Sequence, residues 1–212
     1  MTKKIWQSCF THQDVIIESR TTAYDGHFTL DKLVIRFKKF NGDWTGPVHR
    51  EQISRGNAAA VLLYDPKKDK VILVEQLRIG CIQDDSIESP WLLELVAGLV
   101  YPGESSIGAI TREAQEEAGV MIEQVALLHE YYNTPGALTE KTAIYCALID
   151  SSSIGGIFGL EEEHEDIQVH VLPFEEVFSQ LINHQLQTSA STVMALQWLK
   201  LNREFINKQV NN

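Results

Sequence analysis

The chain has 212 residues, and 44% of them are hydrophobic, which is enough for one substantial domain or a domain with a smaller appendage. Its formal net charge of −11, with no run of Lys and Arg, argues against a general binder of nucleic acid or anionic membranes, so we expect neither as a partner. An anionic substrate would need a local source of positive charge.

The cysteines and the N-terminal residues bear on where the protein acts. Cys9, Cys81 and Cys146 are odd in number and far apart, so neither a disulfide framework nor a CxxC metal site can be recognised. The first residues, MTKKIWQSCFTHQDV, lack the apolar core of a signal peptide, and no apolar run is long enough to span a bilayer. We therefore expect a soluble protein of the reducing cytoplasm.

The first third of the chain changes character near residue 56. DVIIESR and FTLDKLVIRFKKF have the alternation of strands, so we expect residues 1–56 to form a small antiparallel β-sheet unit. The following runs, AAAVLLYD and KVILVEQLR, are apolar almost throughout, which is typical of strands buried in a larger sheet. A second unit is predicted over residues 57–212.

The rest of the chain alternates strands, helices and two notable loops. VALLHEYY and TAIYCALID read as strands on either side of the loop NTPGALTEK. The long polar segment SSSIGGIFGLEEEHED precedes another strand, and loops of this length are often functional. Helical patterns follow over residues 173–182 and about 190–206.

The stretch GLVYPGESSIGAITREAQEEAGV, residues 98–120, predicts a short helix between a serine cap and Gly119. Apolar residues recur at helical spacing, namely Ile107, Ile110, Ala114 and Ala118. Glu113 and Glu117 should stack one turn apart with Glu116 beside them, on a face away from that apolar stripe.

Three carboxylates on one helical face need an explanation, because like charges at this spacing each cost a few tenths of a kcal/mol (about 0.2–0.5). Their position in the last turn also opposes the helix dipole. A hard divalent cation such as Mg²⁺ or Mn²⁺ would turn this repulsion into coordination. The alternative, for the acidic residues taken alone, is a solvated glutamate-rich helix.

The spacing favours the metal site. The pattern G-x5-E-x7-R-E-A-x-E-E-x-G-V resembles the Nudix box at every charged and glycine position, through Gly98, Glu104, Arg112, Glu113, Glu116, Glu117 and Gly119. This resemblance implies the α/β class, with a Nudix α/β/α sandwich around a mixed sheet, here preceded by the small N-terminal antiparallel unit. It also implies hydrolysis of a nucleoside diphosphate linked to another group.

The same resemblance implies a role for each residue of the box. Glu113 and Glu117 would be catalytic metal ligands for two or more Mg²⁺ ions, or Mn²⁺ in their place. Glu116 and the backbone carbonyl of Ala97 would be further ligands. Structural roles would fall to the charge pair and the glycines of the box, namely Glu104, Arg112, Gly98 and Gly119.

A wider resemblance covers nearly the whole chain. SRGNAAAVLLYD, VILVEQLRIG, PWLLELVAG and SASTVMALQWL, among other segments, look like the bacterial ADP-ribose pyrophosphatase subfamily. That subfamily implies a homodimer that exchanges its N-terminal sheet, and cleavage of ADP-ribose to AMP and ribose 5-phosphate. The alternatives are the same chemistry on GDP-mannose or another sugar nucleotide, and a module that binds ADP-ribose without cleaving it.

The subfamily also implies substrate contacts and a general base. The contacts would be Phe28, Arg50, Glu51, Arg55, Arg78, Leu99, Thr134, Pro135, Gly136 and Glu140, although GALTE departs from the glycine-rich loop expected near the last of these. In the loop GLEEEHEDI, Glu163 matches the catalytic glutamate and Glu165 a nearby acid that touches a metal. Either could act as the base. A solvated acidic loop is the competing interpretation, above all for Glu161 and Glu162.

Overall fold

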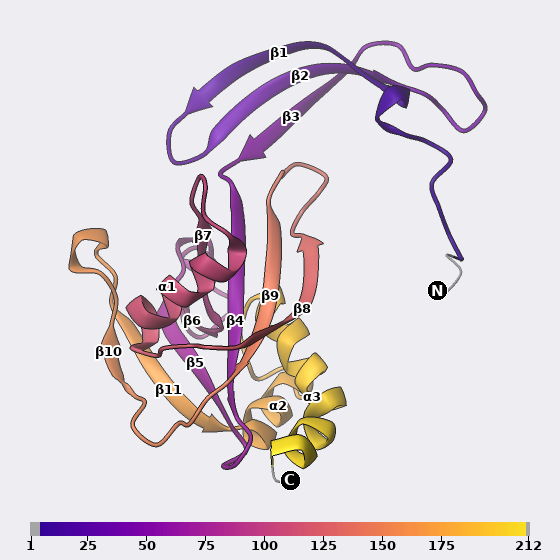
Figure 1. The fold of residues 1–212 in the computed structure, drawn as a ribbon. Helices are drawn as coiled ribbons and strands as arrows, with labels where there is room; N and C mark the ends of the chain where they lie inside the picture. Colours follow the sequence, from indigo (N-terminus) through magenta and orange to yellow (C-terminus); the bar gives the residue numbers. More distant parts are fainter. Residues whose placement is uncertain (1–4, 211–212) are drawn as a thin grey trace. The chain divides into compact units, whose positions relative to one another are not determined.

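The computed structural model describes residues 5–210, which form two compact units (Figure 1). The first unit is the chain up to Arg55 together with Tyr132–Glu140, and the second is Gly56–Tyr131 with the chain from Lys141 onward. The segment Tyr132–Glu140 joins the first unit through backbone hydrogen bonds, because Ile53 N–H donates to Ala137 O and Thr139 N–H donates to Ile53 O. The division of the chain into functional domains at residue 56 stays a prediction.

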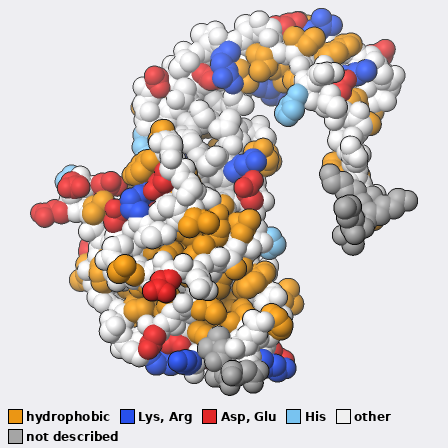
Figure 2. All heavy atoms as spheres, in the orientation of Figure 1, with side chains coloured by type: hydrophobic (Ala, Val, Ile, Leu, Met, Phe, Trp, Pro, Cys, Tyr) orange, Lys and Arg blue, Asp and Glu red, His pale blue; other side chains and the backbone are white. Residues whose placement is uncertain are grey.

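The first unit is built on one antiparallel sheet in the order β1-β2-β3. Its strands are β1 (Val15–Asp25), β2 (Thr29–Phe37) and β3 (Val48–Ser54), after a 3₁₀ turn at His12–Asp14. Within residues 5–55 only Asp31 and Leu33 are buried, and β1 is exposed along its whole length. Figure 2 shows hydrophobic side chains at the surface of this sheet beside Lys and Arg.

The second unit contains an eight-stranded mixed sheet. Its strands are β4 (Asn57–Asp65), β5 (Lys70–Leu77), β6 (Trp91–Glu94), β7 (Val96–Val100), β8 (Val125–Tyr132), β9 (Lys141–Leu148), β10 (Gly156–Phe158) and β11 (Ile167–Pro173). The main path runs β10-β11-β5-β4-β9-β8, while β6 pairs with β5 and β7 pairs with β4. The pair β4 and β9 is parallel, and β4 pairs antiparallel with both β5 and β7.

Helices cover both faces of this sheet (Figure 1). They are α1 (Ser106–Ala118), α2 (Phe174–Ile182) and α3 (Ala190–Val210), and two further 3₁₀ turns lie at Ile79–Cys81 and Glu161–Glu163. Ile110 of α1 packs in one core with Val61 and Leu63, while Leu196 and Leu199 of α3 pack in the other with β4 and β5. The predicted α/β/α sandwich with a mixed sheet and a small antiparallel unit before it is confirmed.

Helix α1 has the ends that its sequence predicts. The side chain of Ser105 accepts a hydrogen bond from Gly108 N–H at 3.0 Å, and Gly119 ends the helix in the left-handed region at φ 64°. The predicted apolar stripe was wrong at its first residue, because Ile107 is 49% exposed and Ala109 is fully buried.

Among residues 5–210, no helix combines the length and the apolar character that crossing a membrane requires.

Candidate active site

A strand and a helix meet at the site. Gly98 lies on β7, and a Cβ added there would overlap the carboxylate of Glu113 on α1. Only glycine lets the helix bring this carboxylate so close to the strand. The glycine and the acid are fifteen residues apart in sequence, and the fold brings them into direct contact.

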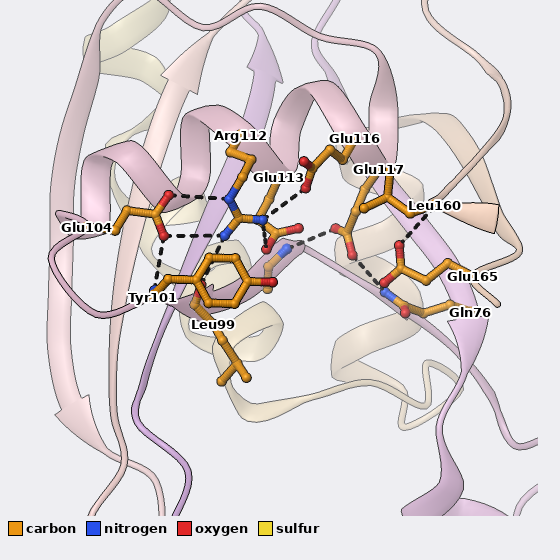
Figure 3. A network of polar contacts seen from close by, with 11 residues as sticks. Gln76, Leu99, Tyr101, Glu104, Arg112, Glu113, Glu116, Glu117, Leu160 and Glu165 are labelled. Atoms are coloured by element: carbon orange, nitrogen blue, oxygen red, sulfur yellow. Dashed lines mark hydrogen bonds and ion pairs between the residues drawn. The ribbon is translucent and has the colours of Figure 1, made fainter. Parts of the chain in front are cut away.

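Glu113 and Glu117 are buried, with exposures of 8% and 2%. The predicted acidic face away from the apolar stripe was therefore wrong for these two residues, because they continue the buried face that carries Ile110 and Ala114. Glu117 accepts hydrogen bonds from Ala97 N–H at 3.0 Å and from the side-chain amide of Gln76 at 3.3 Å (Figure 3). The sheet and the helix together hold this carboxylate.

Burial makes negative charge unfavourable at both acids. It raises the pKa of Glu117 to about 8, with the charge of Glu113 adding to the effect and the charge of Arg78 opposing it. Burial also raises the pKa of Glu113, although Arg112 opposes this shift, and the charges of Glu116 and Glu165 add to it. These mutual effects show that the helix acids, Arg78 and Glu165 lie within one electrostatic neighbourhood.

Arg112 is the internal counter-charge of this cluster. Its Nη1 donates to Glu113 Oε1 at 2.7 Å and to Glu116 Oε2 at 2.9 Å (Figure 3). A guanidinium can serve several acceptors at once because its five donors lie in one plane. Two of the three helix acids are thereby paired within the helix itself.

The other side of Arg112 holds the loop before the helix. The guanidinium donates to Glu104 at 3.3 and 3.4 Å and to the backbone carbonyl of Leu99 at 3.1 Å. Tyr101 closes the arrangement, since its N–H donates to Glu104 and its ring centre lies 4.5 Å from the guanidinium (Figure 3). Arg112 lowers the pKa of Glu104 through these hydrogen bonds. Loop and helix are joined by one charge network.

The carboxylates are suitable ligands for a hard divalent cation, but they are not arranged around a common point. In the part of the chain that the structure describes, no three His, Cys, Asp or Glu side chains are grouped to hold a metal ion. Glu113 and Glu116 instead face Arg112. Carboxylate oxygens, however, are the donors that Mg²⁺ or Mn²⁺ prefers, and a bound cation would offset the burial that raises the pKa of Glu113 and Glu117. The residues present fit such an ion if the Arg112 pairings open.

The loop after β10 carries the two acids predicted as bases. Glu163 ends the 3₁₀ turn Glu161–Glu163 and is exposed, whereas Glu165 is half-buried and accepts from Leu160 N–H at 3.2 Å. His164 between them adopts a left-handed conformation at φ 55°. Glu165 is thus fixed within the loop, and Glu163 faces solvent.

Arg78 lies at the end of β5, next to the acidic cluster. Its Nε is 2.5 Å from Glu94 Oε2 on β6, and Glu94 is 6% exposed. The ion pair fixes one edge of the guanidinium, and the side chain as a whole remains 40% exposed. Arginine held in this way can present its free donors to an anion.

Other predicted contacts come together within the first unit. Arg55 forms an ion pair with Glu140, which is 3% exposed and also accepts a hydrogen bond from Asn133. The guanidinium of Arg55 lies 5.7 Å from the ring centre of Phe28. Three residues that are distant in sequence, Phe28, Arg55 and Glu140, thus form one cluster.

The remaining predicted contacts of this unit are exposed. Arg50 and Glu51 are adjacent on β3, so their side chains leave opposite faces of the sheet. Thr134, Pro135 and Gly136 are exposed in the loop that precedes Glu140. The structure places these residues in the first unit without setting a role for any of them.

Four residues that contact the predicted site residues were missed from sequence: Gln76, Glu94, Tyr101 and Asn133. Alternation along β5 offered one signal, because Gln76 follows Ile72 and Val74 on the face that α1 covers. The partners of Arg78, Arg112 and Glu140 had no such signal, since each contact depends on which segments lie side by side.

The chain is similar to known proteins over most of its length. A family model described as NUDIX domain matches residues 54–195. An ADP-ribose pyrophosphatase of Haemophilus influenzae is 41% identical over 194 residues, 91% of this chain and 89% of the relative. The ADP-ribose pyrophosphatase of Escherichia coli K12 is 39% identical over 200 residues, 94% of both chains. A GDP-mannose pyrophosphatase of Escherichia coli UTI89 is 31% identical over 191 residues, 90% of this chain and 97% of the relative.

Proposed function

Because this chain belongs to the Nudix family, we propose that it hydrolyses the pyrophosphate bond of ADP-ribose, giving AMP and ribose 5-phosphate. The relatives named ADP-ribose pyrophosphatase are more similar to it than those named GDP-mannose pyrophosphatase, which favours this substrate. The observation that carries the proposal is the pair of buried carboxylates, Glu113 and Glu117, beside Gly98. Burying two carboxylates is costly even when Arg112, Gln76 and the Ala97 N–H contact them, so a role in binding a cation gives a reason for their position.

The metal requirement follows from these acids. Mg²⁺, or Mn²⁺ in its place, would be held as two or more ions by Glu113, Glu116, Glu117, Glu165 and the Ala97 carbonyl. Bound ions of this kind neutralise the charge of a diphosphate and supply the positive charge that an acidic chain lacks. Gln76 and the Ala97 N–H would keep Glu117 oriented by donating to it.

The chain's own residues would then perform binding and proton transfer. Glu163 would accept a proton from the attacking water as the water oxygen bonds to phosphorus and the bridging P–O bond breaks. Arg78, fixed by Glu94, would orient the diphosphate. The remaining contacts to ADP-ribose that the family resemblance implies would be made by Leu99, Phe28, Arg50, Glu51, Arg55, Thr134, Pro135, Gly136 and Glu140.

We also propose a homodimer with exchanged N-terminal sheets, acting in the cytoplasm. Val15, Ile16 and Ile17 on β1 are 46, 46 and 56% exposed, on a sheet that buries almost nothing by itself. Residues 1–55 carry nine Lys and Arg against six Asp and Glu, a net +3, within a chain of net −11. Residues 56–212 are therefore strongly acidic, and opposite charges favour pairing between copies. The three free cysteines suit a reducing compartment.

The decisive assay measures phosphate released through a coupled phosphatase, with Mg²⁺ and ADP-ribose, GDP-mannose, ADP-glucose or diadenosine polyphosphates. We expect strong preference for ADP-ribose. Preference for GDP-mannose would retain the chemistry and overturn the substrate. Tight binding of ADP-ribose with no turnover of any compound would instead make the protein a binding module.

Replacing each candidate glutamate by glutamine tests which one is the general base. Glu163→Gln should lower kcat by about 100-fold or more while leaving substrate affinity nearly unchanged, because a general base contributes on the order of 10²–10⁴ to the rate. Glu165→Gln should alter metal dependence instead. If Glu165→Gln shows the pure loss of kcat, Glu165 is the base.

A further inference from the structure

We infer that Phe158 is a positioning residue, which docks the loop carrying Glu163 and Glu165 onto the C-terminal end of helix α1. The inference rests on the proposed function, because it explains how the loop that carries both proposed acids is held against helix α1. It concerns a residue outside the charged motif and outside the acidic loop itself.

The loop connects β10 and β11 of a hairpin, and β11 is buried in the core whereas β10 is mostly exposed. Phe158 on β10 pairs with Ile167 on β11, so residues 159–166 lie between the last paired positions. On the β11 side, Ile167 and Val169 are 0 and 4% exposed and belong to the core. Strand β10 has only three residues, and Gly156 and Ile157 are exposed. Phe158 is the apolar anchor of this side.

The anchor reaches the helix that carries the acids. A Cβ added at Gly119 would lie 2.6 Å from Cε1 and 2.8 Å from Cζ of Phe158, so the ring stands where a side chain at Gly119 would point. Immediately afterwards, Gly159 N–H donates to the carbonyl of Glu116 at 3.2 Å. The first residues of the loop therefore lie on the last turn of α1.

The loop beyond this point is closed on itself. Leu160 N–H donates to the Glu165 carboxylate, and Glu165 N–H donates to Leu160 O, both at 3.2 Å. Gly159 has φ 110°, and a Cβ there would lie 2.7 Å from Cβ of Glu165. A loop with such internal contacts moves largely as one body. The placement of its acids is then set by the contacts of Phe158 and Gly159 with α1.

This arrangement gives Gly119 a second reason to be glycine. Its φ of 64° favours glycine or asparagine, and the ring of Phe158 separately excludes any Cβ. A substituent there would force the ring out and shift the loop with it. Displacements of about 1 Å can lower the rate of a positioned reaction about 100-fold.

The first test compares Phe158→Ala with Ile157→Ala, its exposed neighbour on the same strand. Phe158→Ala should lower kcat for ADP-ribose by about 10- to 100-fold with KM changed less than about threefold, while Ile157→Ala should behave as wild type. Conservative Phe158→Leu should recover part of the loss. Unchanged kcat in Phe158→Ala, or equal losses in both alanine variants, would overturn the inference.

The second test separates the ring contact from backbone strain. Gly119→Asn keeps a residue that tolerates positive φ but adds a Cβ against the ring. It should lower kcat, and in the Phe158→Ala background the same change should have little further effect. If the losses of kcat in Gly119→Asn and Phe158→Ala are fully additive in the double variant, the contact between Gly119 and the Phe158 ring does not position the loop.

A third readout does not depend on turnover. Hydrogen–deuterium exchange of the Gly159 and Leu160 amides should be at least about tenfold faster in Phe158→Ala than in wild type, with the core strands unchanged. If wild-type protein hydrolyses no ADP-ribose but exchange is still faster in Phe158→Ala, the docking of the loop stands and the proposed function is wrong. Equal exchange in an active enzyme would remove the docking and retain the function.

Discussion

Strands β2 and β4 are both nine residues long, and they show how differently one chain can stabilise two sheets. Every residue of β4 from Ala59 to Asp65 is buried, because β4 lies within a sheet that has helices on both faces. Strand β2 lies between β1 and β3 and buries only Asp31 and Leu33. Burial of apolar surface contributes about 25 cal/mol per Å², so pairing alone leaves the first sheet short of stabilisation. The second unit has its own core, and the first has hydrogen bonds without one.

The largest effect should come from the acids of the second unit. Glu113→Gln or Glu117→Gln should lower kcat by at least about 10³-fold, or about 4 kcal/mol in the barrier, because each removes a proposed metal ligand while keeping the packing. Glu123→Gln, an exposed acid just beyond the same helix, serves as the control. Circular dichroism would check the fold. Unchanged turnover would refute the metal assignment.

Truncation of one buried leucine in each sheet compares the two units directly. Leu63→Ala should cost about 2–5 kcal/mol in the free energy of unfolding, because Leu63 is fully buried between strands and helix. Leu33→Ala in β2 should cost only about 1 kcal/mol, since few neighbours surround the space it leaves. Denaturant titration of both variants measures the difference. Equal losses would contradict the view that the first sheet lacks a core.

The raised pKa of Glu117 predicts an unusual pH dependence for the second unit. The folded protein holds this proton up to about pH 8, whereas the unfolded chain releases it near 4.5, so the unfolded state gains stability as pH rises between these values. In EDTA we expect the free energy of unfolding to fall by about 2 kcal/mol as the pH rises across this window. Each pKa unit corresponds to about 1.4 kcal/mol, and water entering the site reduces the effect. Thermal melts should show it, and Mg²⁺ or Glu117→Gln should remove it. Stability that instead rises from pH 5 to 8 in EDTA would contradict the assignment.

The smaller of the two effects on activity should come from the first unit and should appear in binding. Arg55→Lys keeps the charge beside Glu140 but loses the planar fork, so KM for ADP-ribose should rise about tenfold, or about 1.4 kcal/mol, at nearly unchanged kcat. Arg20→Lys, on the same sheet and paired with Asp31, is the matched control. A pure loss of kcat would place Arg55 in the chemistry.

Local features were predictable because local rules determine them. The ends of α1 follow from a serine cap and a glycine that tolerates positive φ, and the strands follow from alternation or continuous apolar runs. The exposure of Ile107 and the burial of Glu113 and Glu117 were not predictable in this way. Periodicity gives the faces of a helix but does not say which side of the apolar stripe the sheet will cover.

The sequence by itself determined the fold class, the charged motif and the family, because residue type and spacing carry them directly. Only the tertiary structure decided the partners: Arg112 between four acceptors, Gln76 on Glu117, Glu94 on Arg78 and Phe158 against Gly119. Each of the last three joins residues at least 16 positions apart, and Arg112 reaches back to Leu99 before its helix. Such contacts depend on how strands and helices pack, which residue spacing along the chain does not encode.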